Sequence, residues 1–334
     1  MNKNEIKNAI ITGADGFIGS YTTKYFISQG VHVTAVGRKA VPMRLAQHEL
    51  LTYVQCDLDA IEQLPELLER LDYDAFIHFA WGNVSVADRA DFGKQLGNAF
   101  TAVKCVEIAA KLGCKRFVGA GTIMEREAEY INHAQGFDTF TPNYYALSKF
   151  NAHYMCKTVA KDLGIELIWP LITNTYGPGE TSSRLIVSTL RKIANGEALS
   201  FTAGTQNYDF VYVEDVAKAF YLATVKGKPF YEYLIGSGKA RPLKEFLLEL
   251  IQTLDGMDDF GKKDIDYQFG TAGFSGVSLP ISTFDASELM NDTGYAPSVS
   301  WKEGVQLTYA WISQIISETD RQTDRQTDRQ TDKQ

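Results

Sequence analysis

Short apolar runs alternate with longer amphipathic segments through the first half of the chain. Glycine or polar residues bound each run, as expected for a strand, and the segments between them have the spacing of a helix with one apolar face. The predicted strands are Asn8–Thr12, Val31–Val36, Leu51–Gln55, Ala75–Phe79, Arg116–Ala120 and Glu166–Leu171. The predicted helices are Phe17–Gln29, Ile61–Leu71, Gln95–Leu112 and Tyr145–Leu163. This alternation predicts an α/β fold in which helices cover both faces of a doubly wound parallel sheet.

The pattern changes after residue 175. Glycine and proline become frequent at Gly177-Pro178-Gly179, and the predicted helices Arg184–Ala194 and Lys244–Leu254 stand among short extended pieces. We expect residues 1–175 to form the sheet domain, and residues 207–237 to return to it because Tyr231–Ile235 has the pattern of one more strand. Residues 176–206 and 238–316 are then a smaller C-terminal α/β domain that binds the substrate.

Residues 317–334 differ from both parts. They repeat a Thr-Asp-Arg-Gln unit with almost no apolar side chain. Such a segment buries too little surface to offset the entropy lost on ordering. We expect a low-complexity polar tail, frayed or helical and exposed to solvent, without a functional role.

Composition narrows the class of protein. The 334 residues include 41 acidic and 33 basic side chains, a formal net charge of -8, and no basic stripe, so nucleic acid and anionic membranes are unsuitable partners. We find no apolar stretch of about 18 residues that could cross a membrane, and no signal peptide before the first strand. The four cysteines show no metal-site spacing. These features predict a cytoplasmic protein with reduced core cysteines and no bound metal.

A glycine-rich turn, Gly13-Ala14-Asp15-Gly16-Phe17-Ile18-Gly19, joins the first predicted strand to the first predicted helix. Its three glycines follow a variant of the dinucleotide fingerprint. Glycine permits the tight turn and lets the backbone approach a pyrophosphate, while the helix N-terminus offers N–H groups to that phosphate. The turn therefore predicts a Rossmann-type dinucleotide site that includes Asp15, Phe17 and Ile18 besides the glycines.

The end of the second predicted strand bears on which dinucleotide binds. Proteins that bind NAD usually have an acidic residue there, which grips the ribose 2′-hydroxyl. The strand here ends Ala35-Val36-Gly37-Arg38-Lys39, with two cations and no carboxylate. An arginine fork suits a 2′-phosphate, which a carboxylate would repel. We favour NADP(H) over NAD(H), with Arg38 and Lys39 as ligands; the alternative is that both residues belong to a solvated loop.

A Tyr-x-x-x-Lys pair lies at the start of the predicted helix Tyr145–Leu163. Tyr145 and Lys149 are four residues apart and share one helix face. A phenol with its ordinary pKa near 10 is a poor acid–base catalyst at pH 7, and lowering that pKa by about three units takes about 4 kcal/mol. A neighbouring lysine and an oxidised nicotinamide, both positive, act in that direction. Because the pair follows a dinucleotide turn and a strand that ends at Gly121-Thr122, we predict an acid–base tyrosine.

Together these features resemble the extended short-chain dehydrogenase/reductase family, in particular its nucleotide-sugar epimerases, dehydratases and ketoreductases. The likeness covers most of residues 8–312. Besides the glycine turn and the Tyr-Lys pair, the matching pieces are Asp57-Leu58, Phe76-Ile77-His78-Phe79-Ala80, Asn174-Thr175-Tyr176-Gly177-Pro178-Gly179, Asp209-Phe210-Val211-Tyr212-Val213-Glu214-Asp215-Val216-Ala217 and Ile235-Gly236-Ser237-Gly238.

The resemblance implies roles for single residues. It assigns Thr122 to the reacting sugar oxygen, Tyr145 to proton transfer and Lys149 to the nicotinamide ribose, while the cofactor carries the hydride. The further contacts it implies are Asp57 and Leu58 near the adenine, Phe79, Ala80 and Trp81 along the cofactor, and Asn174 on the nucleotide-sugar. We assign His78 to the core instead, because it lies within an apolar strand.

Departures from the family pattern narrow the reaction. Family 4,6-dehydratases place an Asp-Glu pair directly after the active-site threonine, and enzymes that couple 3,5-epimerisation to reduction place a cysteine two residues after it. This chain has Ile123 and Met124 there, and neither side chain transfers protons. Dehydration is therefore disfavoured, and simple hydride chemistry remains.

Other departures concern the substrate. Leu171 and Tyr208 stand where the family has arginines, and the family's arginine at position 208 typically contacts a substrate phosphate. Arg126 stands where an aromatic residue is usual. Candidates for a compensating charge are Arg184, Arg191 and, as the substrate ligand we select, Arg241. Trp81 and the acidic stretch Glu125–Glu129 either shape an atypical sugar pocket or are a packed ring and a solvated loop.

Three functions stay open at this point. The first is NADPH-dependent reduction of a 4-keto group on a nucleotide-linked deoxysugar. The second is 4-epimerisation of a nucleotide-sugar, which needs the same Thr-Tyr-Lys set. The third is a non-catalytic protein that senses NADP, since fold does not fix function. The resemblance also implies a homodimer formed through the helices that contain Gln95–Leu112 and Tyr145–Leu163.

Overall fold

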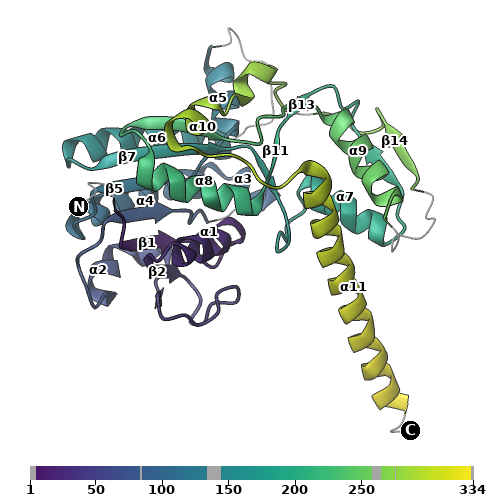
Figure 1. The fold of residues 1–334 in the computed structure, drawn as a ribbon, viewed down its shortest axis with the longest axis horizontal. Helices are drawn as coiled ribbons and strands as arrows, with labels where there is room; N and C mark the ends of the chain where they lie inside the picture. Colours follow the sequence, from purple (N-terminus) through teal and green to yellow (C-terminus); the bar gives the residue numbers. More distant parts are fainter. Residues whose placement is uncertain (1–4, 83–84, 134–143, 258–264, 275, 332–334) are drawn as a thin grey trace. The chain divides into compact units, whose positions relative to one another are not determined.

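The computed structural model describes residues 5–82, 85–133, 144–257, 265–274 and 276–331 (Figure 1). The chain divides into two structural units. The first, which we call the sheet unit, comprises Met1–Thr175, Tyr208–Ala240 and Ser275–Ser298. The second unit comprises Tyr176–Asn207, Arg241–Phe274 and Val299–Gln334.

The sheet unit is built on eight parallel strands, as the pattern of apolar runs predicts. They are β1 (Asn8–Thr12), β2 (His32–Gly37), β3 (Leu51–Gln55), β4 (Ala75–His78), β5 (Arg116–Gly119), β6 (Gly121–Thr122), β7 (Glu166–Ile172) and β12 (Tyr231–Ile235). Their order is β12-β7-β5-β4-β1-β2-β3, and β6 also pairs with β7. The doubly wound parallel sheet is confirmed, as is the strand Tyr231–Ile235 at its edge.

Helices cover both faces of this sheet (Figure 1). Within β1, Ala9 and Ile11 belong to one buried apolar cluster and Ile10 to another, because successive side chains point to opposite faces of a strand. The first cluster includes residues of α1 (Phe17–Ser28) and α8 (Val213–Lys226). The second includes residues of α4 (Phe92–Lys111) and α6 (Tyr144–Asp162). Burial on both faces explains why the strands read as continuous apolar runs.

One predicted helix is wrong. The segment Ile61–Leu71 forms a 3-10 helix, η1 (Leu58–Gln63), followed by a single helical turn, α2 (Leu64–Leu67). Pro65 lies in the first turn of α2. Because proline has no backbone N–H, it cannot continue the hydrogen bonding of the preceding turn, and it marks a new helical start instead.

The two halves of the sheet meet at β1 and β4. From β1 the chain runs outward through β2 and β3 and then returns to β4 on the other side of β1. In open α/β sheets, ligands bind beyond the carboxyl ends of the strands at such a switch point. The segments that leave β1 and β4, beginning at Gly13 and Phe79, are therefore the expected place for a nucleotide.

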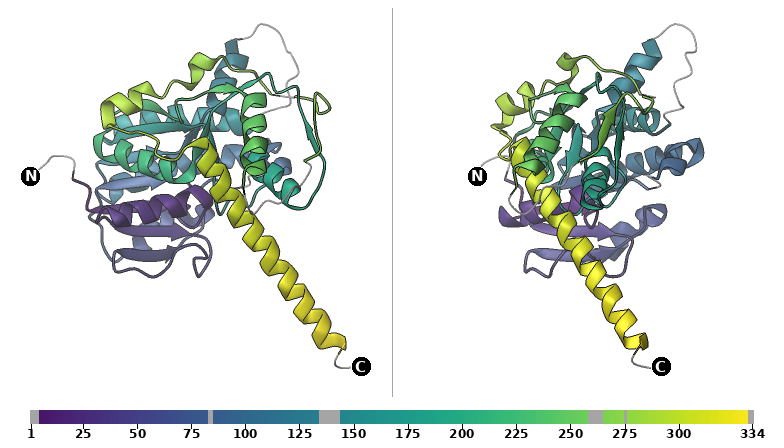
Figure 2. Two further views of the ribbon diagram at one scale, coloured as in Figure 1. Left: turned by 45° about the vertical axis from the view of Figure 1, so that its right-hand side comes forward. Right: turned by 90° about the vertical axis from the view of Figure 1, so that its right-hand side faces the viewer.

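The second unit is mainly helical. It contains α7 (Leu185–Ala194), α9 (Leu243–Asp255) and α11 (Trp301–Thr331), with a parallel pair formed by β9 (Leu199–Phe201) and β14 (Tyr267–Phe269). Val305, Thr308 and Ile312 are buried residues of α11, which packs on α7 and α9. The segment with the Thr-Asp-Arg-Gln repeat continues α11 as one straight helix (Figure 2).

The remaining elements are short. They are α3 (Val86–Arg89), α5 (Met124–His133), β8 (Asn174–Tyr176), β10 (Asn207–Tyr208), β11 (Phe210–Tyr212), β13 (Arg241–Pro242), η3 (Ile281–Phe284) and α10 (Ser287–Thr293). Residues 275–298, which we expected in the smaller domain, instead belong to the sheet unit. The reason is packing: α10 contacts α8 and β12, and its Leu289 is fully buried in the sheet core.

Two general properties follow from the described residues. All four cysteines lie among them and are buried and unbridged. No described helix combines the length and apolar character needed to span a membrane.

Candidate active site

The glycine turn after β1 has the geometry that a nucleotide site needs. Gly13 has a φ of +69°, and a Cβ there would lie 2.7 Å from the backbone nitrogen of Ala80. At Gly19 a Cβ would collide with the carbonyl oxygen of Gly13. α1 then begins after Gly16 without a side-chain cap and without an acidic residue in its first turn. A dinucleotide phosphate fits this helix end, because the N-terminal N–H groups and the helix dipole both favour an anion.

Asp15, predicted as a cofactor ligand, holds the neighbouring loop. Its Oδ1 accepts hydrogen bonds from the amides of Met43 at 2.8 Å and Arg44 at 2.7 Å. These bonds join the glycine turn to the segment that follows β2. The structural role that Asp15 has here is therefore to fix the position of the loop after β2 relative to the glycine turn.

The two cations after β2 lie in a fixed turn. Arg38 and Lys39 have exposed side chains, while their carbonyl oxygens accept hydrogen bonds from the Gln55 amide at 3.1 Å and the Tyr53 hydroxyl at 2.8 Å. Both donors come from β3, which pairs with β2. The sheet thus fixes the backbone of this segment, while both side chains are exposed and the Lys39 ammonium contacts the Met43 sulfur at 2.6 Å.

Asp57 and Leu58, predicted near the adenine, come directly after β3. The Asp57 carboxylate caps η1 by accepting the amide of Asp59 at 3.2 Å. Leu58 is the first residue of η1. Both lie at the carboxyl ends of the strands, the edge where the glycine turn also lies.

Lys149 is buried among aromatic rings and backbone. Its Nζ donates to the carbonyl oxygen of Ala120 at 2.8 Å and lies 3.8 Å from the centroid of the Trp81 ring. The Tyr145 ring meets the same indole edge to face, with centroids 6.2 Å apart. Trp81, from the segment after β4, therefore contacts both members of the predicted catalytic pair. Burial lowers the pKa of Lys149 to about 8, although the Glu125 carboxylate acts in the opposite direction.

Trp81 is itself locked in place. Its Nε1 donates to the Gln95 side chain at 3.0 Å, and the next residue, Gly82, exchanges two hydrogen bonds with the Asn98 amide at 2.9 and 2.8 Å. Two residues earlier, Phe79 packs on Phe220, with ring centroids 4.5 Å apart. The segment predicted to line the cofactor is thus anchored to a helix on each face of the sheet.

Arg89 contacts the predicted catalytic tyrosine, although the sequence did not predict it as a site residue. Its guanidinium lies over the Tyr145 ring, 4.6 Å from the centroid. A cation over a phenol stabilises the ring electrostatically and stabilises its phenolate form more. No sequence signal identifies this arginine, because it lies in a polar stretch that resembles an ordinary solvated turn.

The two residues that follow Thr122 have apolar side chains that cannot transfer protons. Ile123 is buried in an apolar cluster with Leu279 and Phe284, and Met124 packs against that cluster. The hydroxyl of Thr122 accepts the amide of Met124 at 3.4 Å. The positions that hold acidic residues in the family's dehydratases are therefore apolar and engaged in packing.

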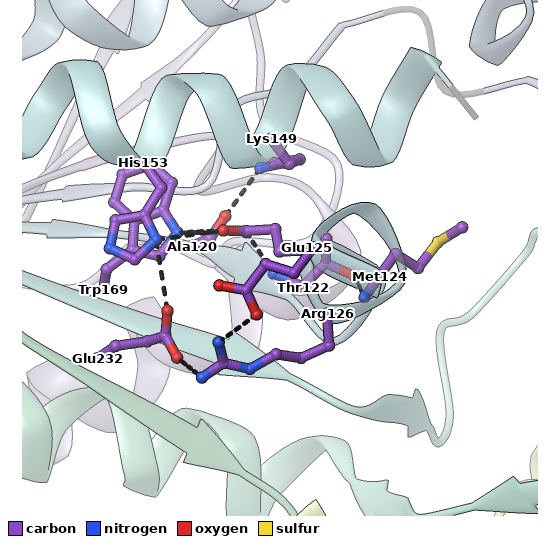
Figure 3. A network of polar contacts seen from close by, with 10 residues as sticks. Ala120, Thr122, Met124, Glu125, Arg126, Lys149, His153, Trp169 and Glu232 are labelled. Carbon is purple, nitrogen blue, oxygen red and sulfur yellow. Dashed lines mark hydrogen bonds and ion pairs between the residues drawn. The ribbon is translucent and has the colours of Figure 1, made fainter. Parts of the chain in front are cut away.

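Glu125 starts a network of polar contacts beneath the predicted hydroxyl (Figure 3). Its Oε1 accepts the amide of Thr122 at 3.0 Å, and both its oxygens lie 3.2 Å from the Trp169 indole nitrogen. The Nδ1 of His153 lies 3.3 Å from Glu125 Oε2 and 3.5 Å from Glu232 Oε2. Arg126 pairs with both Glu232 and Glu129. The interpretation of the acidic stretch as a solvated loop is wrong for Glu125, which is 2 % exposed.

His78 has the structural role that its position predicts. It is buried, and its Nδ1 lies 2.8 Å from the hydroxyl of Thr12. Burial, with a smaller effect of the nearby Lys149 charge, lowers the pKa of His78 to about 3. The imidazole is therefore neutral throughout the physiological range.

Two of the three predicted substrate ligands, Asn174 and Arg241, lie in different units. In the sheet unit, Asn174 donates its side-chain amide to the Asp209 carbonyl at 3.1 Å. The Asp209 carboxylate is buried and accepts the Ser237 amide at 2.8 Å, and burial raises its pKa to about 6. In the second unit, Arg241 pairs with Glu249 and lies over the Phe246 ring, 4.1 Å from the centroid.

A glycine turn at the switch point of a doubly wound sheet and a buried Tyr-Lys pair are features of Rossmann-type enzymes that use a nicotinamide cofactor. Residues 9–236 match the model of the NAD dependent epimerase/dehydratase family. The chain belongs to this family, and the resemblance to extended short-chain dehydrogenases that the sequence suggests is thereby confirmed.

Known relatives are similar over nearly the whole chain. A human dTDP-D-glucose 4,6-dehydratase is 23% identical over 321 residues, which cover 91% of this chain and 89% of that protein. Among solved structures, UDP-glucose 4-epimerase from Thermotoga maritima has a TM-score of 0.73 at 21% identity, covering 92% of this chain and 99% of that one. RMD from Pseudomonas aeruginosa, solved with NADPH, has a TM-score of 0.67 at 20% identity, covering 92% and 100%. These structures share the fold, and their ligands are properties of those proteins.

Proposed function

We propose that this chain reduces a 4-keto group on a nucleotide-linked deoxysugar, with NADPH as the hydride donor. The observation that carries the proposal is the arrangement around Lys149: its Nζ bonds the Ala120 carbonyl, two residues before Thr122, and it shares the Trp81 ring with Tyr145. These contacts support a single cluster of hydroxyl, phenol and ammonium.

In this proposal Tyr145 transfers the proton. NADPH, when bound, would supply the hydride for the reduction. The Tyr145 phenol gives its proton to the carbonyl oxygen, which becomes the alcohol. Thr122 donates a hydrogen bond to the same oxygen and holds it toward the phenol. Two cations, Lys149 and Arg89, stabilise the phenolate that remains.

The residues after Thr122 disfavour dehydration of the sugar. Removing water across a sugar bond needs an acid and a base beside the hydroxyl, and Ile123 and Met124 occupy the relevant positions. Glu125 does not replace them, because its carboxylate is 2 % exposed and already accepts from the Thr122 amide and the Trp169 indole. The similarity to dehydratases therefore reflects the fold.

A preference for NADP(H) rests on the turn after β2. Arg38 and Lys39 are exposed there, and their backbone is fixed by two side chains of β3. A 2′-phosphate at this place meets two positive charges and no carboxylate from the strand end, which favours it by charge and geometry. The family description names NAD, whereas one structural neighbour was solved with NADPH. The proposed preference for NADP(H) therefore rests on Arg38 and Lys39.

The second candidate is 4-epimerisation of a nucleotide-sugar. The fold is shared with a UDP-glucose 4-epimerase, and the same three residues serve both reactions. An epimerase returns the hydride to the sugar, so it uses no net cofactor.

Purified protein is assayed with NADPH and 4-keto-6-deoxy sugars linked to dTDP, UDP, CDP and GDP. We expect one mole of NADPH to be oxidised per mole of alcohol formed, and no turnover by Tyr145→Phe. Interconversion of 4-epimers without net NADPH loss, by protein that retains tightly bound cofactor, selects the epimerase. Turnover that survives Tyr145→Phe removes the proposed acid–base, and binding of NADP(H) without turnover of either kind selects the cofactor-sensing protein.

We also propose a cytoplasmic homodimer formed through α4 and α6, which pack on each other. Phe92, Leu96 and Phe100 are exposed large apolar side chains that recur every four residues along α4, so they share one face. On α6, the exposed apolar residues are Leu147, Tyr154 and Met155. An apolar surface spread over two adjacent helices suits a second copy of the same surface.

Light scattering after gel filtration tests this association. We expect twice the chain mass for the wild type and the chain mass for Phe100→Asp. Leu71→Asp, at an exposed apolar residue that belongs to neither helix, is the matched control and should stay dimeric. A monomeric wild type contradicts the proposal.

A further inference from the structure

The backbone segment 120–122, which carries the predicted hydroxyl, is held at both ends by buried side chains of opposite charge. At one end, Lys149 donates to the Ala120 carbonyl at 2.8 Å. At the other, Glu125 accepts the Thr122 amide at 3.0 Å. Figure 3 shows both side chains directed at this segment. Glu125 is thus placed to affect Thr122 through the backbone and Lys149 through charge.

Several other charged or titratable groups lie around Lys149 and Glu125, and none of them replaces Glu125 as the negative charge for Lys149. They are Tyr145, His153 and Cys156 on α6, Arg126 and Glu129 on α5, Arg89 on α3, His78 on β4 and Glu232 on β12. His78 is neutral, and burial raises the pKa of Cys156 to about 12, so its thiol is neutral too. Glu129 and Glu232 are both paired with Arg126. A buried ammonium without a partner is costly, and an anion nearby offsets that cost.

We propose that Glu125 is a positioning residue of the active site, which holds Thr122 through its amide and supplies the negative charge that keeps Lys149 an ammonium. The inference rests on the proposed function for the roles of Thr122 and Lys149. The stacked pair of His153 and Trp169, with centroids 4.8 Å apart, packs beside the carboxylate and excludes water from it. The carboxylate therefore acts at full strength in a medium of low polarity.

Two substitutions separate the two tasks. Glu125→Gln keeps an acceptor for the Thr122 amide and removes the charge, so the alkaline limb of kcat/KM, expected near pH 8, should move down by about one pH unit. At pH 6.5 its kcat should remain within about threefold of the wild type. Glu125→Asp keeps the charge and shortens the reach, so its alkaline limb should stay in place while kcat falls by about tenfold at every pH.

The control is Glu62→Gln, which removes an exposed carboxylate paired with Lys104 at 3.2 Å. It should leave both kcat and the pH profile unchanged. An alkaline limb that does not move in Glu125→Gln overturns the proposal. A loss of kcat in Glu125→Gln that is equal at every pH shows a merely structural role and overturns it as well.

A thermal-unfolding cycle tests the charge coupling without any substrate. Glu125→Gln should lower the Tm at pH 7 in the wild-type background, and the loss should be less than half as large in a Lys149→Met background. Equal losses in the two backgrounds contradict the coupling. Because this cycle needs no turnover, a failure of the proposed reaction and a failure of this proposal give different results.

Discussion

Replacing Lys149 by methionine should change how the stability of the fold depends on pH. The substitution removes one ammonium and keeps an unbranched chain that can fill the same space beside Trp81. Lys149 is 5 % exposed, and burial lowers its pKa from the ordinary 10.5 to about 8. A proton is thus bound less tightly in the folded chain than in the unfolded chain.

The sign and size follow from this difference. Between about pH 8 and 10.5 the unfolded state binds more protons than the folded state, so the contribution of Lys149 to stability rises with pH. That contribution is complete above pH 10.5 and is lost as the pH falls through 8. At about 1.4 kcal/mol for each tenfold change in proton affinity, the whole effect is about 3 kcal/mol. About 2 kcal/mol of it falls between pH 7 and 9.5.

The assay is urea denaturation of the wild type and Lys149→Met at pH 7 and pH 9.5. We expect the free energy of unfolding of the wild type, relative to that of the variant, to be about 2 kcal/mol greater at pH 9.5 than at pH 7. Comparing the two proteins cancels the titration of groups that do not interact with Lys149. His78 and Cys156, which do interact with it, have pKa values of about 3 and about 12, outside this pH range. Lys161→Met, at an exposed lysine of the same helix, should show no such difference. Parallel profiles for the wild type and Lys149→Met would refute the reasoning.

Three further predictions concern the predicted nucleotide and phenol sites. Gly13→Ala should abolish NADP(H) binding and lower the free energy of unfolding by more than Gly30→Ala, because an added Cβ meets backbone at 2.7 Å at Gly13 and nothing within 4 Å at Gly30. Since both glycines have a positive φ, Gly30→Ala should still lower the free energy of unfolding by about 1 kcal/mol. Equal losses for the two variants in urea denaturation would contradict this prediction. Replacing Arg38 and Lys39 together by alanine should raise the Kd for NADPH at least tenfold and leave that for NADH within about twofold, which titration of protein fluorescence measures. Arg89→Leu should lower kcat/KM by about tenfold, and an unchanged value in steady-state kinetics would exclude a role for this cation.

Much of the sheet unit could be predicted because its signals are local. Strands buried on both faces appear as short apolar runs, and the predicted runs Asn8–Thr12, Leu51–Gln55 and Tyr231–Ile235 match β1, β3 and β12 residue for residue. The glycine turn is equally local as a sequence signal, since its three glycines lie close together in the chain, although the close approach of Gly13 to Ala80 depends on the tertiary structure. Where two local signals compete, as around Pro65, the prediction failed.

The functional assignments from sequence remain predictions of residue type and order. Thr122, Tyr145 and Lys149 are recognisable because one helix face and one strand end place them at fixed spacing. Arg89 has no such spacing, and it reaches the Tyr145 ring only through the path of the chain after β4. Residues 275–298 likewise join the sheet unit through packing of α10 that no local pattern indicates.

The sequence by itself determined the parallel sheet, the glycine turn and the Tyr-Lys pair, because each depends on periodicity or spacing within one element. Only the tertiary structure decided that Glu125 is buried beneath Thr122, in contact with Trp169 and near Glu232, residues 44 and 107 positions away. An acidic side chain at the start of a polar helix looks solvated in sequence. Glu125 is buried because strands and a helix from distant parts of the chain pack around it. In the proposed role, this burial strengthens the electrostatic interaction of its charge with Lys149.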